Sequence, residues 1–230
     1  MEAWQQRHEA LLPGSCEILA KKHITVFGIG GVGSFLCEAL ARAGVGAFTL
    51  IDADEVSESN INRQLIATHA TVGEKKTEVM RERILSINPK ASVECINRFV
   101  KAEELATLMN FHTDYIADAV DTVSLKLELA RYAYEKNIPI IASMGTGNKI
   151  HPELFELADI YETSVCPLCR AMRSRLKAIG VKKLRVVYSK EEPIKATLEK
   201  TDGRYPPASV SFTPPVAGMI MAGEIIRGLI

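Results

Sequence analysis

Four closely spaced glycines in the first half of the chain have the pattern of a phosphate-binding turn. They stand between an apolar, β-branched run at 23–27 and a helical pattern at 34–43: Gly28, Gly30, Gly31 and Gly33. Glycines let backbone N–H groups approach phosphate oxygens, and the amino end of the following helix adds partial positive charge. The turn is therefore predicted to bind a nucleotide.

Charged residues beyond the next apolar run indicate how that nucleotide is used. Asp52 ends the run at 47–51, where a carboxylate can accept hydrogen bonds from ribose hydroxyls. Arg63 and Lys76 lie in the polar segments that follow and are expected on the phosphate side of the site. Two cations there would neutralise charge on an α-phosphate under attack and on departing pyrophosphate. The pattern favours ATP as a reactant, with a nicotinamide-dependent oxidoreductase as an alternative.

Asp121 is the candidate ligand for a metal ion. It follows an apolar strand pattern at 114–119, so it is expected at the carboxyl end of the sheet. Mg²⁺ is a hard cation that prefers oxygen ligands, and a carboxylate there suits it. The alternative is that Asp121 caps the helix expected from residue 124, because aspartate is a favoured N-cap.

Alternating strand and helix patterns position these residues. The predicted strands are 23–27, 47–51, 91–96, 114–119 and 138–143, and the predicted helices are 34–43, 74–88, 102–109 and 124–136. This alternation implies parallel strands covered by helices on both faces, with ligands beyond the carboxyl ends of the strands. Past residue 144, strands are expected at 154–160 and 184–188, a basic helix at 168–178, and a final helix after Pro214 and Pro215. The predicted fold class is α/β, a Rossmann-like, doubly wound, mainly parallel sheet with an elaborated C-terminal part.

Composition limits the classes of protein that fit. The 230 residues are 47% hydrophobic and 24% charged with a formal net charge of zero, which is typical of a soluble enzyme and not of a disordered chain. Neither a signal peptide nor an uninterrupted membrane span is recognisable, because Glu224 and Arg227 interrupt the longest apolar stretch. Five cysteines, an odd number, favour a reducing compartment. We expect a cytoplasmic protein without a membrane partner.

Five segments resemble the adenylating enzymes of the ThiF/MoeB type, relatives of the ubiquitin-activating enzymes: VFGIGGVGS, LIDADEVSESNINRQ, VGEKKTEVM, INPKA and ADAVDT. In that family a substrate carboxylate attacks the α-phosphate of Mg-ATP, giving an acyl-adenylate and pyrophosphate. The resemblance implies that the four glycines line the phosphates, that Asp52 holds the ribose and that Asp121 binds Mg²⁺. It assigns further ATP contacts to Asp54, Asn60, Arg63, Gln64 and Lys76.

The same resemblance implies a homodimer in which an N-terminal arginine reaches the ATP of the partner. Arg7 is the matching residue, and its other interpretation is a solvated surface charge. The implied catalytic residues are Arg7, Arg63, Lys76 and Asp121. A single domain over 1–230 is expected, with a helical arm at 1–22, a nucleotide-binding core at 23–145 and a substrate-binding part with dimer contacts at 146–230.

The C-terminal third resembles the tRNA threonylcarbamoyladenosine dehydratase branch of the family, in ASMGTGNKIHPELFELADIYETSVCPLCRAMRSRLK, KKLRVVYSKEEPIK and PASVSFTPPVAGMIMAGEIIRGLI. The implied reaction is an ATP-dependent cyclisation. The threonyl carboxylate of the modified adenosine is adenylated, and a nitrogen of its own ureido group closes a ring and expels AMP. A nucleophile held beside the acyl-adenylate has a high effective molarity, so no enzyme cysteine is required. His151 departs from the branch, which has an aspartate at this place, and would weaken the function or make it pH-sensitive.

A tRNA substrate requires a positively charged surface. Between 170 and 204 there are eleven Lys and Arg residues against four acidic ones. The predicted tRNA-binding residues are Arg170, Arg173 and Lys177, which share a helix face by their spacing, with Lys182 and Lys183. A solvated basic face is the alternative. Tyr161, Tyr188 and Tyr205 are candidates to stack on a base, or simply to pack.

Other interpretations concern the pair Cys166 and Cys169. One CxxC supplies two of the four ligands of a closed zinc site, so no zinc is expected. A redox dithiol, a nucleophilic Cys166 and a structural role remain open.

The alternative function is adenylation of the C-terminal glycine of a ubiquitin-like sulfur carrier, and a sulfur-transfer protein is a further candidate partner.

Overall fold

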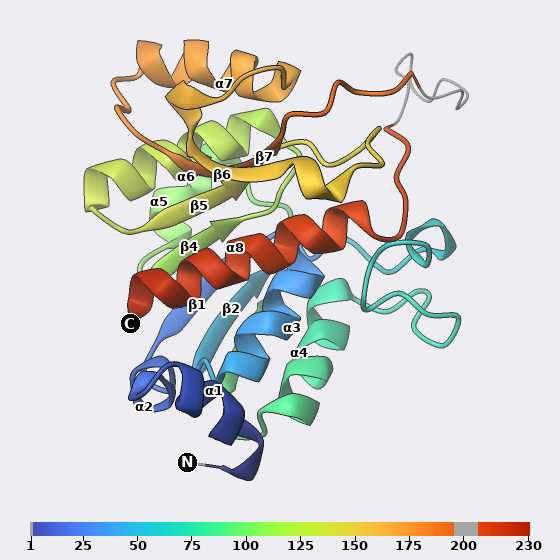
Figure 1. Ribbon diagram of the computed structural model, residues 1–230, viewed down its shortest axis with the longest axis vertical. Coiled ribbons are helices and arrows are strands. Elements are labelled where there is room, and N and C mark those ends of the chain that lie inside the picture. Colours follow the sequence, from blue (N-terminus) through green and yellow to red (C-terminus); the bar gives the residue numbers. More distant parts are fainter. Residues whose placement is uncertain (1, 196–206) are drawn as a thin grey trace.

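Seven strands form one sheet within residues 2–195 and 207–230, the part of the chain that this computed structural model describes (Figure 1). Their order across the sheet is β3-β2-β1-β4-β5-β7-β6. The strands are β1 (His23–Phe27), β2 (Ala47–Ile51), β3 (Ser92–Ile96), β4 (Tyr115–Asp118), β5 (Ile140–Ser143), β6 (Phe155–Asp159) and β7 (Arg185–Ser189). All neighbouring pairs are parallel except β6 and β7, which are antiparallel. The predicted fold class is confirmed.

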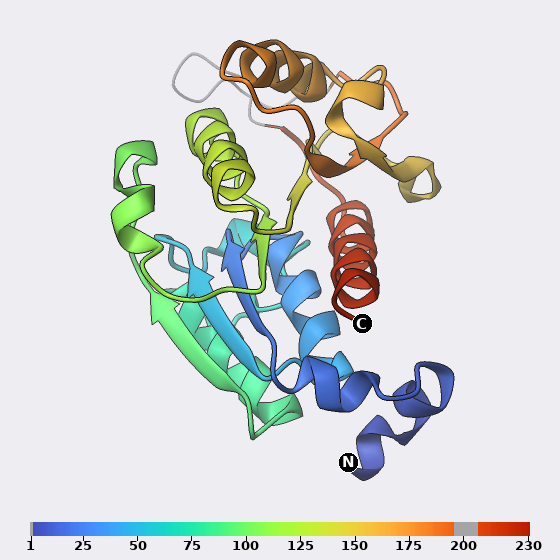
Figure 2. The same cartoon turned by 90° about the vertical axis from the view of Figure 1, so that its left-hand side faces the viewer.

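Helices cover both faces of the sheet (Figure 2). The α-helices are α1 (Gln6–Leu11), α2 (Ser15–Leu19), α3 (Gly33–Ala43), α4 (Lys76–Ile87), α5 (Leu105–Leu108), α6 (Val123–Lys136), α7 (Pro167–Ala178) and α8 (Thr213–Leu229). One core joins α3, α4 and α8 to the sheet, and two further apolar clusters lie under α5, α6 and α7 on the other face. Burial of these apolar faces is the main stabilising contribution.

Two predicted helices differ from the observed ones. The helix expected at 102–109 is a 3₁₀ turn, Ala102–Glu104, followed by the short α5. The last helix does not begin after its two prolines but contains them in its first turn, since α8 starts at Thr213. The first N–H groups of a helix have no partner within the helix, so proline is tolerated there.

The C-terminal third extends the sheet and then returns to the first half of the molecule. β7 pairs with β5, and β6 pairs with β7 at the edge. α8 then crosses to α3, where Ala217 and Met221 share a core with Leu36 and Leu40 (Figure 1). The predicted division into an arm, a core and a substrate part stays a prediction.

The N-terminal helices lie at the amino ends of the strands. Leu19 of α2 is fully buried, and its carbonyl accepts the Gly46 N–H at 3.0 Å, just before β2 begins. Ligand-binding groups at the carboxyl ends are therefore at the other end of the sheet from α1 and α2 (Figure 1). In the described residues, every helix is too short or too polar to cross a bilayer.

Candidate adenylation site

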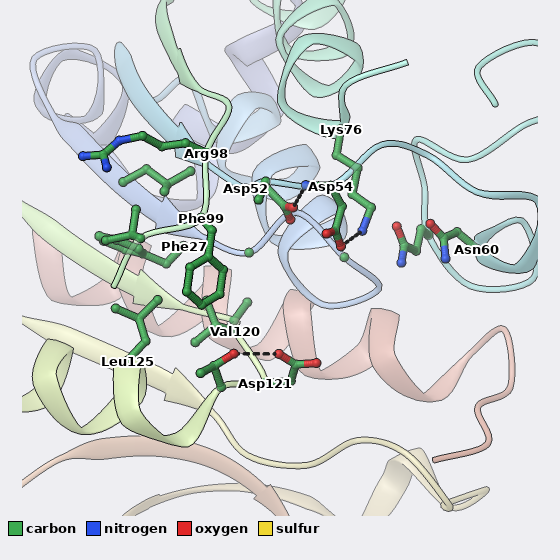
Figure 3. Close-up of a pocket in the computed structure, with 18 of the residues that line it drawn as sticks. Phe27, Asp52, Asp54, Asn60, Lys76, Arg98, Phe99, Val120, Asp121 and Leu125 are labelled. Carbon is green, nitrogen blue, oxygen red and sulfur yellow. Dashed lines mark hydrogen bonds and ion pairs between the residues drawn. The ribbon is translucent and has the colours of Figure 1, made fainter. Parts of the chain in front are cut away.

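A cavity of about 350 Å³ lies at the carboxyl ends of β1, β2 and β4 (Figure 3). Parallel register brings these ends together, because Phe27 of β1 pairs with Ile51 on one side and Asp118 on the other. Nine of the predicted site residues line the cavity: Gly28, Gly30, Asp52, Asp54, Asn60, Arg63, Gln64, Lys76 and Asp121. Ligands of open α/β sheets bind at this position.

The glycine turn packs tightly against the residues that directly follow β4. Gly28 has φ +87°, and a Cβ there would lie 2.7 Å from the Ala119 carbonyl oxygen. A Cβ at Gly33 would lie 1.8 Å from the carbonyl oxygen of Gly28, so any side chain would force α3 away from β1. Gly31 faces Pro214 and, like Gly33, does not line the cavity. Phosphate contacts by these two glycines stay a prediction.

Asp52 joins the end of β2 to the glycine turn. Its carboxylate accepts the Ile29 N–H at 2.6 Å and the Asp54 N–H at 2.9 Å. Both bonds use backbone donors, so the side chain is oriented without a cation. A carboxylate fixed in this way at the cavity wall retains lone pairs that can accept ribose hydroxyls.

Lys76 is the buried cation of the site. Its side chain is 7% exposed and its ammonium Nζ donates to Asp54 at 2.7 Å, while the Asp54 side chain is 67% exposed. The backbone holds the same pair, because the Lys76 N–H donates to the Asp54 carbonyl. Since Asp54 is open to solvent, a phosphate can replace it as the partner of Lys76 at little desolvation cost.

The segment between β2 and α4 supplies further polar groups. Arg63 donates to the Ser59 carbonyl and to the Asn62 side chain, both at 2.8 Å. Asn60 is buried and accepts the Ser57 N–H. The buried Gln64 Oε1 has no hydrogen-bond partner among the residues described here. The three side chains that were predicted together thus line one cavity.

Asp121 does not cap a helix. The N-cap of α6 is Thr122, and within the described part of the chain the Asp121 carboxylate accepts a hydrogen bond from the Thr122 hydroxyl, at 3.3 Å. The capping interpretation was therefore wrong. The exposed carboxylate and a neighbouring hydroxyl are oxygen donors of the kind that Mg²⁺ takes together with substrate phosphates. No group of three or more His, Cys, Asp or Glu that could hold a metal occurs within 2–195 and 207–230.

Sequence reasoning missed the apolar wall of the cavity and a basic residue beside it. These residues are Phe27, Ile51, Arg98, Phe99, Val100, Val120 and Leu125. Phe99 is 60% exposed, which is unusual for a large apolar side chain. Its ring lies beside Val120 at the cavity (Figure 3). Arg98, Phe99 and Val100 follow β3, so their position at the carboxyl end of a strand is the signal that could have found them.

Arg7 lies far from the cavity of its own chain. It is exposed on α1, at the amino ends of the strands, whereas the cavity is at the carboxyl ends (Figure 1). An intramolecular contact between Arg7 and the nucleotide is excluded by this placement. The predicted contact across a dimer stays a prediction.

The predicted tRNA-binding residues divide into two kinds. Arg170, Lys177, Lys182 and Lys183 are exposed. Arg173 is partly buried and its guanidinium donates to the carbonyl, at 2.9 Å, and to the hydroxyl of Thr163, so it fastens α7 to the preceding turn. The ion pairs found within 2–195 and 207–230 include none of these five basic residues.

Two of the three tyrosines proposed to stack on a base, Tyr161 and Tyr188, make contacts within the protein. Tyr188 is 2% exposed and cannot stack on a base, so of its two interpretations packing in the core is the one observed. Tyr161 donates its hydroxyl to the Val181 carbonyl at 2.5 Å. Tyr205 lies outside the described residues.

The two thiols of the CxxC segment are buried side by side at the start of α7. Cys166 is the N-cap residue, and its pKa is lowered to about 6 by the hydrogen bond from the Cys169 thiol, against its burial. The same contact raises the pKa of Cys169. The structure forms no disulfide among the five cysteines. The expectation of no zinc stays a prediction.

His151 belongs to a loop held by a buried carboxylate. Glu191 accepts the backbone N–H groups of Ile150 and His151, both at 3.0 Å, and the buried Lys149 donates to the Glu191 carbonyl at 2.6 Å. The His151 ring itself is exposed and contacts Glu153 at 2.8 Å. The backbone of this loop is thus fixed independently of the residue type at position 151.

Comparisons with known proteins give one family, and several curated relatives that match most of this chain carry the same name. The chain matches the ThiF family over residues 5–230. It is 39% identical over 226 residues to the tRNA threonylcarbamoyladenosine dehydratase of Bacillus subtilis (strain 168), covering 93% of this chain and 89% of that protein. It is 42% identical over 181 residues to the enzyme of the same name from Escherichia coli (strain K12), covering 77% of this chain and 68% of that protein. A crystal structure of E. coli TcdA, a tRNA N6-threonylcarbamoyladenosine dehydratase in complex with ATP, covers the whole chain with a TM-score of 0.88 and 34% identity, and 96% of that chain is covered.

Proposed function

The chain belongs to the ThiF family, and on this premise we propose that it is an ATP-dependent enzyme that dehydrates N6-threonylcarbamoyladenosine in tRNA. The observation that carries the proposal is the placement of Lys76, Arg63 and Asp121 around one cavity at the glycine turn. Positive charge at this position would stabilise the negative charge that develops on a phosphate under attack and on a departing phosphate group. The relatives that carry the dehydratase name identify the carboxylate substrate.

In the first step, a carboxylate oxygen of the substrate attacks the α-phosphorus of ATP, and the bond to pyrophosphate breaks. Lys76 leaves Asp54 to bind the phosphates, and Arg63 adds a second positive charge. Asp52 accepts the ribose hydroxyls. The apolar wall of Phe99, Val120 and its neighbours provides a surface for the base. Mg²⁺ bound by Asp121 would supply charge neutralisation at the phosphates.

In the second step, a ureido nitrogen of the same nucleoside attacks the acyl carbon, loses its proton and expels AMP. The carboxylate oxygen leaves with AMP, so the nucleoside loses one water overall. The nucleophile and the acyl group belong to one molecule, and their proximity supplies much of the rate. No step requires the buried Cys166.

The remaining parts of the proposal concern partners. tRNA binds along α7 and the turn after it, through Arg170, Lys177, Lys182 and Lys183. The protein acts in the cytoplasm as a homodimer, in which Arg7 of one subunit reaches the nucleotide of the other. Activation of a ubiquitin-like sulfur carrier is the less favoured reading, because the relatives that match most of this chain carry the dehydratase name.

Mass spectrometry of nucleosides tests the proposal directly. tRNA that carries threonylcarbamoyladenosine is incubated with the protein and Mg-ATP, then digested under mild conditions that preserve a labile ring. Loss of one water from that nucleoside, only with ATP, is the expected result. An unchanged nucleoside, together with pyrophosphate exchange stimulated by a sulfur-carrier protein, would contradict it.

A further inference from the structure

A buried ion pair lies beneath the cavity wall that carries Asp121. Lys126 of α6 donates from Nζ to Asp118 Oδ1 at 2.9 Å, and both side chains are 1% exposed. Asp118 ends β4, and Lys126 is in the first turn of α6. Neither residue lines the cavity, and neither has a part in the steps described above.

The pair connects the two ends of one short loop. The loop runs from Ala119 to Thr122, between β4 and α6. Asp118 Oδ1 also accepts the Val120 N–H, at 3.2 Å, and the Lys126 N–H donates to the Thr122 carbonyl, at 3.1 Å. The loop is thus held at its start, in its middle and at its end through these two residues.

The loop in turn forms a wall of the site. Val120, Asp121, Thr122 and the adjacent Leu125 all line the cavity, and Figure 3 shows Val120, Asp121 and Leu125 along one side of it, with Asp54 and Lys76 away from them. Ala119 also lies against the glycine turn, because its carbonyl oxygen would be 2.7 Å from a Cβ at Gly28. A shift of this loop would therefore move the metal-binding carboxylate relative to the phosphates.

Stability does not account for the pair. Removing two charges from water is costly, and replacing a buried ion pair by well-packed hydrophobic residues of similar volume is often neutral or stabilising. Here the pair is also incompletely bonded, since the buried Asp118 Oδ2 has no hydrogen-bond partner in the described part of the chain. An expensive pair placed directly behind ligand-binding residues indicates a functional role.

We propose that Asp118 and Lys126 are positioning residues that fix the Asp121 loop for binding of the metal–nucleotide complex. This inference rests on the proposed use of ATP and Mg²⁺. Residues that orient a metal ligand from behind have large effects on metal affinity without touching the metal. Their loss should affect binding of Mg-ATP and spare binding of ATP alone.

Calorimetry with the neutral pair Asp118→Asn/Lys126→Gln tests this, with ATP titrated in Mg²⁺ and, separately, in EDTA. The side chains keep similar sizes, and the asparagine can still accept the Val120 N–H. The dissociation constant for Mg-ATP should rise about tenfold, while that for ATP in EDTA stays within about twofold of the wild type. Equal constants in Mg²⁺ for variant and wild type, or equal losses in both conditions, would overturn the inference.

Two further variants of the chain complete the test. The matched control is Lys22→Gln/Asp114→Asn, which neutralises a partly buried 3.0 Å pair at the amino end of β4 and should leave both constants unchanged. If the neutral pair at the site does not fold, Lys126→Met is measured in its place, since a protonated Asp118 removes the unpaired charge, and the same selective loss is expected. A wild type that binds no ATP in either condition would refute the proposed function instead.

Discussion

The phosphate side of the cavity and the basic surface of α7 both depend on Lys and Arg, but they hold these residues differently. In the cavity, Lys76 and Arg63 are already hydrogen-bonded to oxygen atoms of the chain itself. On α7, Arg170 and Lys177 extend into solvent. A buried cation needs a partner at all times, here Asp54 and in the proposed reaction a phosphate, whereas an exposed cation is available to any polyanion. The first arrangement suits chemistry at a fixed atom, and the second suits a long substrate bound through many weak contacts.

Replacing the buried cation should have the largest effect. Lys76→Ala should lower the rate of AMP release by about 10³-fold, because a charge aimed at the reacting phosphate is lost. The measurement is single-turnover AMP formation with saturating tRNA. The neighbouring Lys75→Ala is the control, since Lys75 is 45% exposed and pairs with Glu55. Equal rates for the two variants would remove the distinction between buried and exposed cations.

Arg7 can contact the nucleotide only across a dimer, in the cavity of the other subunit. Arg7→Ala should lower turnover by about 10²-fold by removing positive charge from the nucleotide. Mixing it with Asp121→Ala subunits should restore part of the activity, since each mixed dimer contains one intact site. The mixture is assayed against each variant alone, at equal total protein. No restoration would assign Arg7 to the solvated surface.

Charge reversal on α7 should act on tRNA alone. Arg170→Glu with Lys177→Glu should raise the KM for tRNA about tenfold at low salt and reduce its dependence on salt, because fewer counterions are released on binding. The affinity for ATP should not change. Lys90→Glu, at the amino ends of the strands, is the matched exposed control. An unaltered salt dependence would move the tRNA surface away from α7.

The smallest effect on activity is expected for Arg173, the basic residue of α7 whose guanidinium is bonded within the protein. Arg173→Ala should lower the free energy of unfolding by about 1–3 kcal/mol, because it removes the hydrogen bonds to Thr163. Arg170→Ala should leave it unchanged. Denaturant unfolding at equilibrium measures both. If Arg170→Ala is equally destabilising, the proposed distinction between the two arginines fails.

The cavity and the basic surface of α7 also differ in how well the sequence predicted the roles of their residues. Gly28, Asp52 and Lys76 occur in short motifs, each just after a strand or at the start of a helix, and all three line the cavity. Arg173 could not be separated from Arg170 by spacing, because its role depends on the turn at Thr163. The Asp118–Lys126 pair is equally invisible, since a lysine on a helix is normally predicted to be exposed. The roles of Arg173, Asp118 and Lys126 depend on contacts between separate elements of the fold, whereas a sequence motif describes only one local segment.

The return of α8 to α3 has a consequence for how the chain is made. α3 follows the glycine turn directly, yet the apolar surface around Leu36 and Leu40 is completed by residues 217–225, almost two hundred positions later. During synthesis on the ribosome, this surface stays uncovered until α8, residues 213–229, has emerged. The glycine turn and α3 can therefore reach their final packing only after that helix is available, and until then the exposed apolar surface favours aggregation.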